Sequence, residues 1–541
     1  MNTTCGSRLF LRYTPQQKYR KLTTQQWQRP LGHETGIKVY SCITRNLVPL
    51  ILPNDNIATW YTCGPTVYDA THLGHASCYV KLDIMQRILR QHFGINLVTA
   101  MNVTDIDDKI ITKSIETGKS WIEIAKSHET AFWQDLQSLN VSDPNLKVRV
   151  TDNIPQIVAF IAKILEKGKA YVGQDNSVFF DVKTHPSYGK LQKLNPEEIK
   201  SSANSTSQNK ASAADFALWK AQKTVNEPSW DSPWGPGRPG WHIECSVLAS
   251  MIFGNKIDFH AGGLDLKFPH HENEEAQSCV FHDKEQWVNY WIHTGHLNVK
   301  GQKEKMSKSL KNAISIQQLL SKYSSDTFRM ACVLSNYRNA VEYSDELMEN
   351  SSNTLQKFKS FKADCRAYFN GHKQGSDFES NVILEEIKKA SVSVDACFKQ
   401  DFDTAHSIGV LSELISTVRR FINISSTDST ASGFISSSSL DVVAAVDNFM
   451  DKTLNNFGFQ FAVNTSQSIR ESNASSEVNL NALLDDILKS RKIIRDKAVT
   501  LKNKDLFQIC DDLRNCLKQH GIDIKDHNQG SSWSYSTSNK R

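Results

Sequence analysis

The fold of this chain is decided by residues 57–101, IATWYTCGPTVYDATHLGHASCYVKLDIMQRILRQHFGINLVTAM. The first seven residues of this segment are mainly apolar and a Gly-Pro pair follows them, which is typical of a buried strand. Residues 75–93 place apolar side chains on one helical face, and residues 95–101 have the pattern of a second strand. A strand, a helix and a strand in this order predict a βαβ unit, from which parallel sheets are built.

The composition is that of a globular protein. The chain has 541 residues, of which 39% are hydrophobic and 22% are charged, so it can form buried cores in roughly three or four domains. Collagen-like, fibrous and wholly disordered classes are excluded. No apolar run approaches the ~18 residues of a membrane span, and we expect no membrane partner. The 11 cysteines include no Cys-x-x-Cys pair, which favours a reducing compartment over a disulfide scaffold.

Residues 1–35 have the composition of a mitochondrial transit peptide. Six basic residues precede the first acidic residue, Glu34, and the apolar run at 9–11 is too short for a secretory signal. We therefore expect the protein in the mitochondrial matrix, with a basic tail of no targeting function as the alternative. Without these six charges the chain has 57 basic and 58 acidic residues, so any nucleic acid must be bound through local patches.

The motif His72-Leu73-Gly74-His75 lies between the first strand and its helix. A loop in that position is at the carboxyl end of a parallel strand, where doubly wound sheets bind ligands. The helix N-terminus offers N–H groups and a positive dipole to a phosphate, and Gly74 permits close approach of the backbone. The motif therefore predicts a phosphate site; a polar helix start is the alternative interpretation.

A second motif, Lys305-Met306-Ser307-Lys308-Ser309, follows the apolar stretch 296–299. Two lysines that flank a serine can close on a triphosphate and stabilise the charge of a departing pyrophosphate. A lysine run by itself is usually a solvated loop. The two motifs in this order, some 230 residues apart, resemble the HIGH and KMSKS signatures of class I aminoacyl-tRNA synthetases.

A third set of residues has the side chains of a metal site. Cys63 ends the first strand and Cys245 lies far downstream. His270 and Glu274 are four residues apart, which places them on one face of the helix that we expect there. Two thiolates, one imidazole and one carboxylate form an acceptable zinc set, although their spacing is not that of a zinc finger. His271 is an alternative ligand to His270.

These residues stand in segments that resemble cysteinyl-tRNA synthetases. The resemblance runs from about 37 to 345 and returns at 492–533, and with the basic leader it is closest to the mitochondrial form of the family. The similar segments are CGPTVYD (63–69), NVTDIDDK (102–109), FALWK (216–220), PGRPGWHIEC (236–245) and those around His270 and Lys305.

The resemblance implies an α/β fold with three folded parts. A Rossmann-like catalytic domain with a parallel sheet would occupy residues 36–345, with an inserted connective region at about 115–235 that contains a mobile loop at 201–213. An α-helical tRNA-binding domain at 346–505 would follow. A small C-terminal anticodon-recognition domain would occupy residues 506–541.

The resemblance also implies an enzyme, a class I cysteine–tRNA ligase. It would join L-cysteine to ATP as cysteinyl-adenylate and transfer the cysteinyl group to tRNA(Cys) for mitochondrial translation, as a monomer. One Zn²⁺ per chain and Mg²⁺ with ATP are the implied cofactors. A secondary formation of cysteine persulfide is implied too, but the sequence shows no dedicated site for it.

The residues that match the family's site fall into three groups. The implied zinc ligands are Cys63, Cys245, His270 and Glu274. The implied catalytic and ATP-binding residues are His72, Gly74, His75, Lys305 and Lys308. The cysteine pocket would be lined by Trp241, Thr104 and Asp265.

Two other functions would use part of these motifs. A ligase that joins cysteine to a sugar amine would not need an RNA-binding tail, and a non-catalytic RNA binder would not need the catalytic motifs. Residues 489–504 hold seven Lys and Arg residues, which we expect to contact RNA phosphates. Trp533 is predicted to stack on an unpaired anticodon base. This tail argues against the first alternative, and the intact motifs argue against the second.

Overall fold

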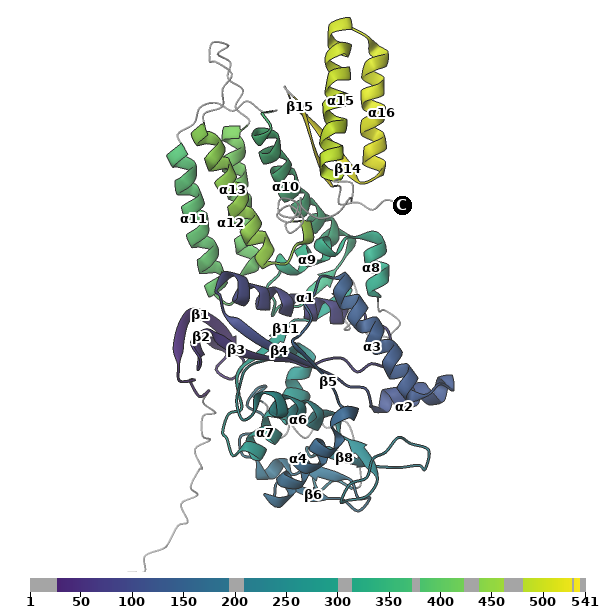
Figure 1. Ribbon diagram of the computed structural model, residues 1–541. Helices are drawn as coiled ribbons and strands as arrows, with labels where there is room; N and C mark the ends of the chain where they lie inside the picture. The colour runs from purple at the N-terminus through teal and green to yellow at the C-terminus, as the bar shows by residue number, and fades with distance from the viewer. Residues whose placement is uncertain are drawn as a thin grey trace, which may run out of the picture.

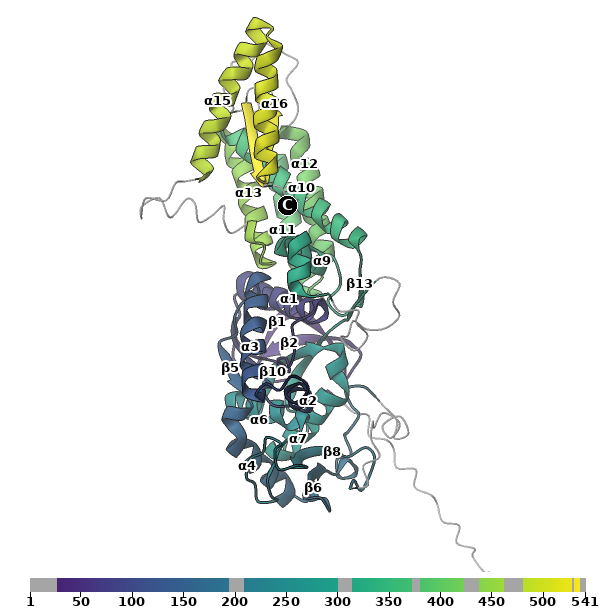
Figure 2. The same cartoon turned by 90° about the vertical axis from the view of Figure 1, so that its right-hand side faces the viewer.

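The computed structural model describes residues 27–193, 209–299, 314–371, 380–422, 437–461, 480–527 and 530–535. These residues form an elongated molecule (Figures 1 and 2). The part expected to be catalytic, residues 27–343, lies at one end and is called the catalytic part below. A C-terminal unit lies at the other end. Of the expected mobile loop at 201–213, residues 201–208 lie outside the described residues, as do residues 1–26 of the expected transit peptide.

A five-stranded, wholly parallel sheet forms the centre of the catalytic part (Figure 1). Its spatial order is β11 (Val288–Thr294), β10 (Ile257–Gly263), β3 (Ile57–Thr62), β4 (Asn96–Val103) and β5 (Leu146–Arg149). All seven residues of β11 are buried, as expected for a strand of a sheet that is covered on both faces. The strand order reverses beside β3, and doubly wound sheets bind ligands at the carboxyl ends of the strands at such a point.

The predicted βαβ unit is confirmed, with one change at the start of its helix. Helix α1 (Leu73–Arg87) continues into a wider turn at Ile88–His92 and connects β3 to β4. It begins two residues earlier than predicted because His72 is its N-cap and accepts a hydrogen bond from the N–H of Gly74. Both histidines of the motif therefore lie at the first turn of α1.

An insertion separates β5 from β10. It contains α4 (Ile154–Glu166) and a four-stranded antiparallel sheet of β6 (Ala170–Val172), β7 (Val178–Phe180), β8 (Phe216–Ala221) and β9 (Gly237–Pro239). The expected start near residue 115 is too early, because β5 belongs to the central sheet and α3 (Trp121–Ser138) packs Phe132 and Leu136 against Met101 of β4. The short helix α2 (Asp108–Thr117) precedes α3.

The chain returns to the central sheet through α6 (Trp241–Phe253) and α7 (Glu272–His282), which follow β9 and β10. After β11, the strands β12 (Leu297–Val299) and β13 (Val341–Tyr343) pair in parallel around α8 (Ile316–Lys322) and α9 (Ser325–Val333). These elements carry the chain from the catalytic part to the helices beyond it.

Four long helices form a bundle above the sheet in Figure 1. They are α10 (Asp345–Phe369), α11 (Ser380–Lys399), α12 (Thr404–Ile422) and α13 (Ser437–Asn456). Their apolar faces share one core with the sheet and α1, so the bundle and the catalytic part are packed continuously.

The C-terminal unit contains α15 (Leu480–Leu501), α16 (Lys504–Gln519) and a hairpin of β14 (Ile522–His527) and β15 (Gly530–Tyr535). Leu484 and Leu488 of α15 form one apolar cluster with Ile522 and Trp533 of the hairpin. The expected domain boundary at residues 505 and 506 would separate helices that pack together, so we place the start of this unit at α15.

The described chain begins with an irregular segment, residues 27–32, which we call the N-terminal strap. It precedes the hairpin of β1 (His33–Ser41) and β2 (Asn46–Leu52). The indole of Trp27 donates a hydrogen bond to the backbone oxygen of Asn289 in the edge strand β11 (2.9 Å). The backbone of Gln28 both donates to and accepts from the side chain of Gln286. Residues 27–35, the last part of the expected targeting segment, therefore contact the folded sheet in this structure.

Within the described part of the chain, none of the helices combines the length and the apolar character that a membrane crossing requires.

We predict that Trp27 stabilises the catalytic part. Trp27→Ala removes a half-buried ring and a hydrogen bond from the edge of the sheet and should lower the free energy of unfolding by ~1–3 kcal/mol, or the melting midpoint by ~2–8 °C. Thermal unfolding followed by circular dichroism measures this shift. Leu31→Ala is the matched control in the same strap, because the Leu31 side chain is 89% exposed; equal shifts for both variants would contradict the role of Trp27.

Candidate functional site

The first turn of α1 places His72 and His75 side by side at the carboxyl end of β3. Their rings are stacked, with centroids 3.9 Å apart. A Cβ at Gly74 would lie 2.9 Å from the His72 ring, so the glycine makes room for that ring to fold back onto the helix N-terminus. The positive end of the helix dipole and the two imidazoles thus face the same region.

The segment that leaves the second motif runs beside this turn. Lys305 and Lys308 lie outside the described residues, but Ile314 follows them closely and its backbone oxygen accepts a hydrogen bond from the N–H of Leu73 (3.0 Å). Ser315 forms a β-bridge with His72. The first motif therefore has residues 314 and 315, which follow the second motif in the sequence, as its neighbours in space.

Four side chains predicted as metal ligands meet in the interior beside this turn. Their donor atoms all lie within 4.8 Å of one another, and each residue is at most 4% exposed. They come from four places: the end of β3, the first turns of α6, the turn at Lys267–His271 and α7. The contributing residues are Cys63, Cys245, His270 and Glu274.

The distances between these donor atoms fit a tetrahedral metal. A zinc ion with bonds of ~2.3 Å to sulfur and ~2.0 Å to nitrogen would separate its two sulfurs by ~3.8 Å and a sulfur and a nitrogen by ~3.5 Å. The Sγ atoms of Cys63 and Cys245 are 3.7 Å apart, and Cys63 Sγ is 3.6 Å from His270 Nε2. Glu274 Oε1 lies 3.5 Å from the same sulfur and 3.0 Å from His270 Nε2.

Further histidines contact these ligands from outside. His242 Nδ1 lies 2.9 Å from His270 Nδ1, and His260 Nε2 lies 2.9 Å from Glu274 Oε2. Such outer contacts orient metal ligands, since they occupy the ligand atom that does not face the metal. The sequence analysis did not identify either residue; the only signal was that His242 lies three residues before Cys245 and His260 lies in the next strand.

Burial shifts the pKa values of the two thiols and of the imidazole. It raises the pKa of Cys245 to about 11 and the pKa of Cys63 well above its usual value. It also lowers the pKa of His270 well below its usual value, so that the imidazole is neutral and has a lone pair to donate. Thiols in this environment are protonated at neutral pH unless a cation stabilises the thiolates.

His271 is a geometric competitor of His270. Its Nε2 lies 3.4 Å from Cys63 Sγ, and Cys63, His260 and His271 form a second group of three donors. Its other nitrogen, Nδ1, is 2.9 Å from His293 Nε2. Only the group that contains His270 has four donors, among the residues that the structure describes.

The three residues expected to line a cysteine pocket differ in their contacts and exposure. The Trp241 indole stacks on the His270 ring with centroids 4.4 Å apart and is 36% exposed. Thr104 is buried and donates a hydrogen bond to Glu244 (2.8 Å), whose pKa is raised well above its usual value by burial. Asp265 is partly exposed, 3.5 Å from His296. Glu244 is a buried acid that the sequence analysis missed.

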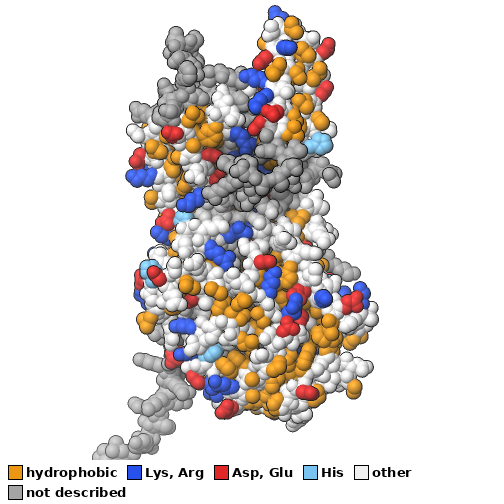
Figure 3. Space-filling view, viewed as in Figure 1, with side chains coloured by type: hydrophobic (Ala, Val, Ile, Leu, Met, Phe, Trp, Pro, Cys, Tyr) orange, Lys and Arg blue, Asp and Glu red, His pale blue; other side chains and the backbone are white. Residues whose placement is uncertain are grey.

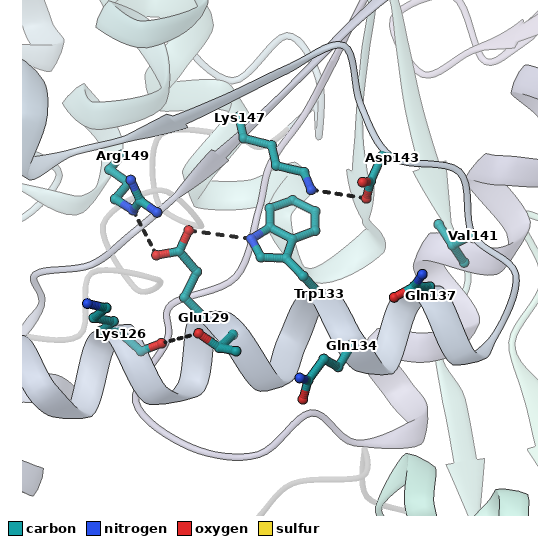
Figure 4. Close-up of a pocket in the computed structure, with 10 residues that line it drawn as sticks. Lys126, Glu129, Trp133, Gln134, Gln137, Val141, Asp143, Lys147 and Arg149 are labelled. Carbon is teal, nitrogen blue, oxygen red and sulfur yellow. Dashed lines mark hydrogen bonds and ion pairs between the residues drawn. The ribbon is translucent and has the colours of Figure 1, made fainter.

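A separate open groove of about 550 Å³ lies between α3 and β5 (Figure 4). Four of the charged groups along it are paired with one another, because Arg149 binds Glu129 (2.8 Å) and Lys147 binds Asp143 (3.0 Å). None of the predicted site residues lines it. The groove is therefore distinct from the metal cluster.

Two expectations for RNA binding by the tail are wrong. Trp533 is 3% exposed and donates a hydrogen bond to Asp485, so its ring cannot stack on a base. Arg491 is 1% exposed and binds Asp526 with Nη1 (2.5 Å), so it cannot reach a phosphate. Both residues complete the small core of the C-terminal unit. On the face shown in Figure 3, charges of both signs are mixed along this unit.

The fold and one family model agree on the class of protein. Residues 51–353 match the model of the tRNA synthetases class I (C) catalytic domain. Among solved structures, methionyl-tRNA synthetase of Mycobacterium tuberculosis in complex with methionyl-adenylate has a similar fold, with a TM-score of 0.59 and 14% sequence identity over 76% of this chain and 93% of that chain. Together with the parallel sheet and the turn at His72, these matches define a class I aminoacyl-tRNA synthetase.

Curated relatives narrow the assignment. The chain is 40% identical to a probable mitochondrial cysteine–tRNA ligase of Xenopus tropicalis, over 94% of this chain and 91% of the relative. It is 37% identical to a cytoplasmic cysteine–tRNA ligase of Dictyostelium discoideum and 36% identical to a cysteine–tRNA ligase of Metallosphaera sedula, over 93% and 92% of this chain. The chain belongs to the cysteine–tRNA ligase family, and the resemblance noted in the sequence is confirmed.

The geometry predicts that His270, and not His271, is a metal ligand. His270→Ala should abolish tight binding of a divalent metal ion at this group, because it removes one of four donors. His271→Ala is the matched control and should retain the ion. Elemental analysis of the purified variants measures both; loss of metal from His271→Ala alone would assign the site to the competing group.

Proposed function

We propose that this enzyme attaches L-cysteine to tRNA(Cys) in two steps, through cysteinyl-adenylate and with release of pyrophosphate, for translation in the mitochondrial matrix. The observation that carries this proposal is the buried group of two thiols, one imidazole and one carboxylate beside the first turn of α1. A site for a soft metal next to a phosphate site is what a cysteine-activating enzyme requires. The family membership and the mitochondrial relative support it further.

The metal that best fits Cys63, Cys245, His270 and Glu274 is Zn²⁺, one ion per chain, since it accepts mixed sulfur, nitrogen and oxygen ligands in tetrahedral geometry. When bound, zinc would supply a soft Lewis acid that takes the sulfur of cysteine as an additional ligand and holds it as a thiolate. Serine differs from cysteine by one atom, and a hydrophobic pocket separates such near-isosteres by only ~10²-fold. Selection by a soft metal would remove the need for a separate editing site.

The residues of the chain itself would bind and orient the other reactant. His72, His75 and the N–H groups at Gly74 would hold the phosphates of ATP, with Mg²⁺ as its counterion, at the positive end of α1. Lys305 and Lys308 would stabilise the negative charge that develops on the departing pyrophosphate. Loss of such a contact costs ~1.4 kcal/mol of transition-state stabilisation per tenfold in rate.

The remaining pocket residues would position cysteine. Trp241 stacks on His270 and leaves about a third of its surface exposed, so it can cover the substrate beside the metal ligands. Thr104 and Asp265 would contact the polar groups of the amino acid. The helical bundle and the C-terminal unit would hold tRNA, through exposed cations such as Lys497 and Lys502 and not through Arg491 or Trp533.

The decisive experiment compares Cys245→Ser with Cys279→Ser. The unaltered enzyme should contain one zinc and show cysteine-dependent ATP–pyrophosphate exchange and charging of tRNA(Cys). Cys245→Ser should lose the zinc and at least ~100-fold of the exchange rate, because a metal ligand is removed. Cys279 is the matched control, a buried cysteine of the same apolar cluster outside the donor group.

Exchange without charging by the unaltered enzyme would favour the alternative ligase that joins cysteine to a sugar amine. Full exchange activity in metal-free enzyme would contradict the role of the metal.

A second experiment tests the C-terminal unit. Truncation of the chain before Leu480 removes α15, α16 and the hairpin together. Because these elements share one apolar cluster, no part of that cluster is left behind without its partners. We expect the rate of cysteine-dependent exchange to stay within about twofold of the full chain, because the donor group and His72 lie in the catalytic part. The KM for tRNA should rise by more than ~tenfold, because contacts to phosphates are lost. Steady-state charging assays measure this change; a truncated enzyme that charges tRNA as well as the full chain would show that the unit does not bind tRNA.

A further inference from the structure

One turn of α9 binds the segment that follows α13 through hydrogen bonds. Asp326 accepts hydrogen bonds from the backbone N–H groups of Gln460 (2.9 Å) and Phe461 (3.2 Å). Arg329, one turn further along α9, donates from Nη1 to the backbone oxygen of Phe457 (3.0 Å). The N–H groups and the carbonyl of this segment are therefore held by the two opposite charges of one helical turn.

Arg329 also binds a second helix end. Its Nη2 donates to the backbone oxygens of Leu139 (2.9 Å) and Asn140 (2.7 Å), which lie at the C-terminus of α3. Phe457 directly follows α13, so the guanidinium meets the negative ends of two helix dipoles. Only 1% of this side chain is exposed, so the hydrogen bonds of Nη1 and Nη2 to protein oxygens take the place of bonds to water.

The end of α1 completes the arrangement. Arg329 Nη1 lies 2.6 Å from Asp83 Oδ2, and Arg87 donates to the same carboxylate (2.8 Å) and to the backbone oxygen of Asn140 (2.9 Å). Burial raises the pKa of Asp83, but the two guanidinium groups outweigh this effect and hold it below its usual value. The carboxylate therefore stays charged and keeps both arginines in place.

The segment after α13 is fitted closely to these groups. The side chain of Asn140 donates to the backbone oxygen of Gly458 (2.7 Å). Gly458 has φ +74°, and a Cβ there would lie 2.7 Å from Arg87 Nε. We call Asp83, Arg87, Asn140, Asp326 and Arg329, together with residues 457–461, the interdomain clamp.

The clamp joins the bundle to α1, which begins at the first signature motif, and to α9, which follows the second motif in the sequence. Helix α1 has Asp83 and Arg87 in its last turns and His72 at its start, ~20 Å away along one rigid helix. Helix α9 follows α8 and Ser315, and Ser315 bridges His72. Any displacement of residues 457–461 against α1 and α9 would therefore shift the bundle relative to the site.

At its far end the bundle is fixed to the C-terminal unit. Lys525 of β14 binds Asp364 of α10 (2.7 Å), and the guanidinium of Arg366 lies over the Trp533 ring at 4.9 Å. The clamp and these contacts form a continuous connection from the first turn of α1 to the C-terminal unit.

We propose that the interdomain clamp positions the tRNA, through the bundle, for the transfer of cysteine, and that Asn140, Asp326 and Arg329 are positioning residues for that step. The inference rests on the proposed charging of tRNA. In this step the terminal ribose hydroxyl attacks the cysteinyl carbonyl, a ribose ester bond forms, the bond from the carbonyl to phosphate breaks, and the hydroxyl proton leaves with AMP. Cysteine activation needs no such alignment, because ATP and cysteine contact only the catalytic part.

Two substitutions in the full chain test the clamp without removing a buried charge. Asn140→Gly removes the hydrogen bond to Gly458 and keeps a backbone with φ +56° that glycine adopts freely. Gly458→Ala inserts a methyl group against Arg87. The matched control is Asn176→Gly, an asparagine with φ +65° in an exposed turn of the insertion.

For both clamp variants we expect the kcat of tRNA charging to fall by ~5–20-fold, because misplacement of a reacting group by about 1 Å can cost ~10²-fold. For the clamp variants, the KM for tRNA and the rate of cysteine-dependent exchange should stay within about twofold of the values of the unaltered enzyme. For Asn176→Gly, the kcat and KM of charging and the exchange rate should all stay within about twofold. If Gly458→Ala fails to fold, Asn140→Gly carries the test, with its melting midpoint measured alongside.

Normal charging by Asn140→Gly, or a parallel loss of exchange and charging, would overturn the inference. Absence of cysteine-dependent exchange in the unaltered enzyme would instead refute the proposed function, so the two failures are distinguishable.

Discussion

The catalytic part depends on one electrostatic constraint, the burial of four electron-pair donors within 4.8 Å of one another. Buried polar groups are stable only when they are paired, and a carboxylate out of water needs a cation or hydrogen-bond donors. Glu274 is fully buried, and its oxygens contact His260 and His270. A metal ion among these atoms would stabilise the thiolate forms, which burial by itself disfavours.

The insertion is fastened to this group by the same helix that supplies Glu274. Glu272 of α7 accepts hydrogen bonds from the backbone N–H groups of residues 189–191, and Lys190 binds Glu275 (2.6 Å). Burial and the attraction of Glu275 act in opposite directions on Lys190, and the net effect raises its pKa. Because three neighbouring acids of α7 serve the insertion and the donor group together, the insertion cannot shift without disturbing the site.

Several arginines of this chain form ion pairs within the protein. In the C-terminal unit, Arg491, Arg495 and Arg514 all bind the single carboxylate of Asp526, so part of the basic stretch at 489–504 stabilises the unit itself. At the interdomain clamp, Arg87 and Arg329 are likewise used for internal contacts. Cations that are counted as an RNA-binding patch in a sequence are thus divided between structure and surface by packing.

Local patterns determined much of this protein without any structure. The apolar run at 57–63, the helix after it and the strand at 95–101 predicted the parallel sheet, because the periods of strands and helices are visible in a short window. The residue types at Cys63, Cys245, His270 and Glu274 likewise suggested a metal, because few other combinations suit it.

Only the tertiary structure decided what depends on contacts between distant segments. Examples are the burial of Arg491 and Trp533 and the contacts of His242 and His260 with the metal ligands. The contacts of residues 27–35 with the sheet and the interdomain clamp are further examples. A single side chain has the same intrinsic chemistry in either setting. Whether it meets water, a phosphate or a helix end is decided by packing between residues up to several hundred positions apart, and no local pattern records that.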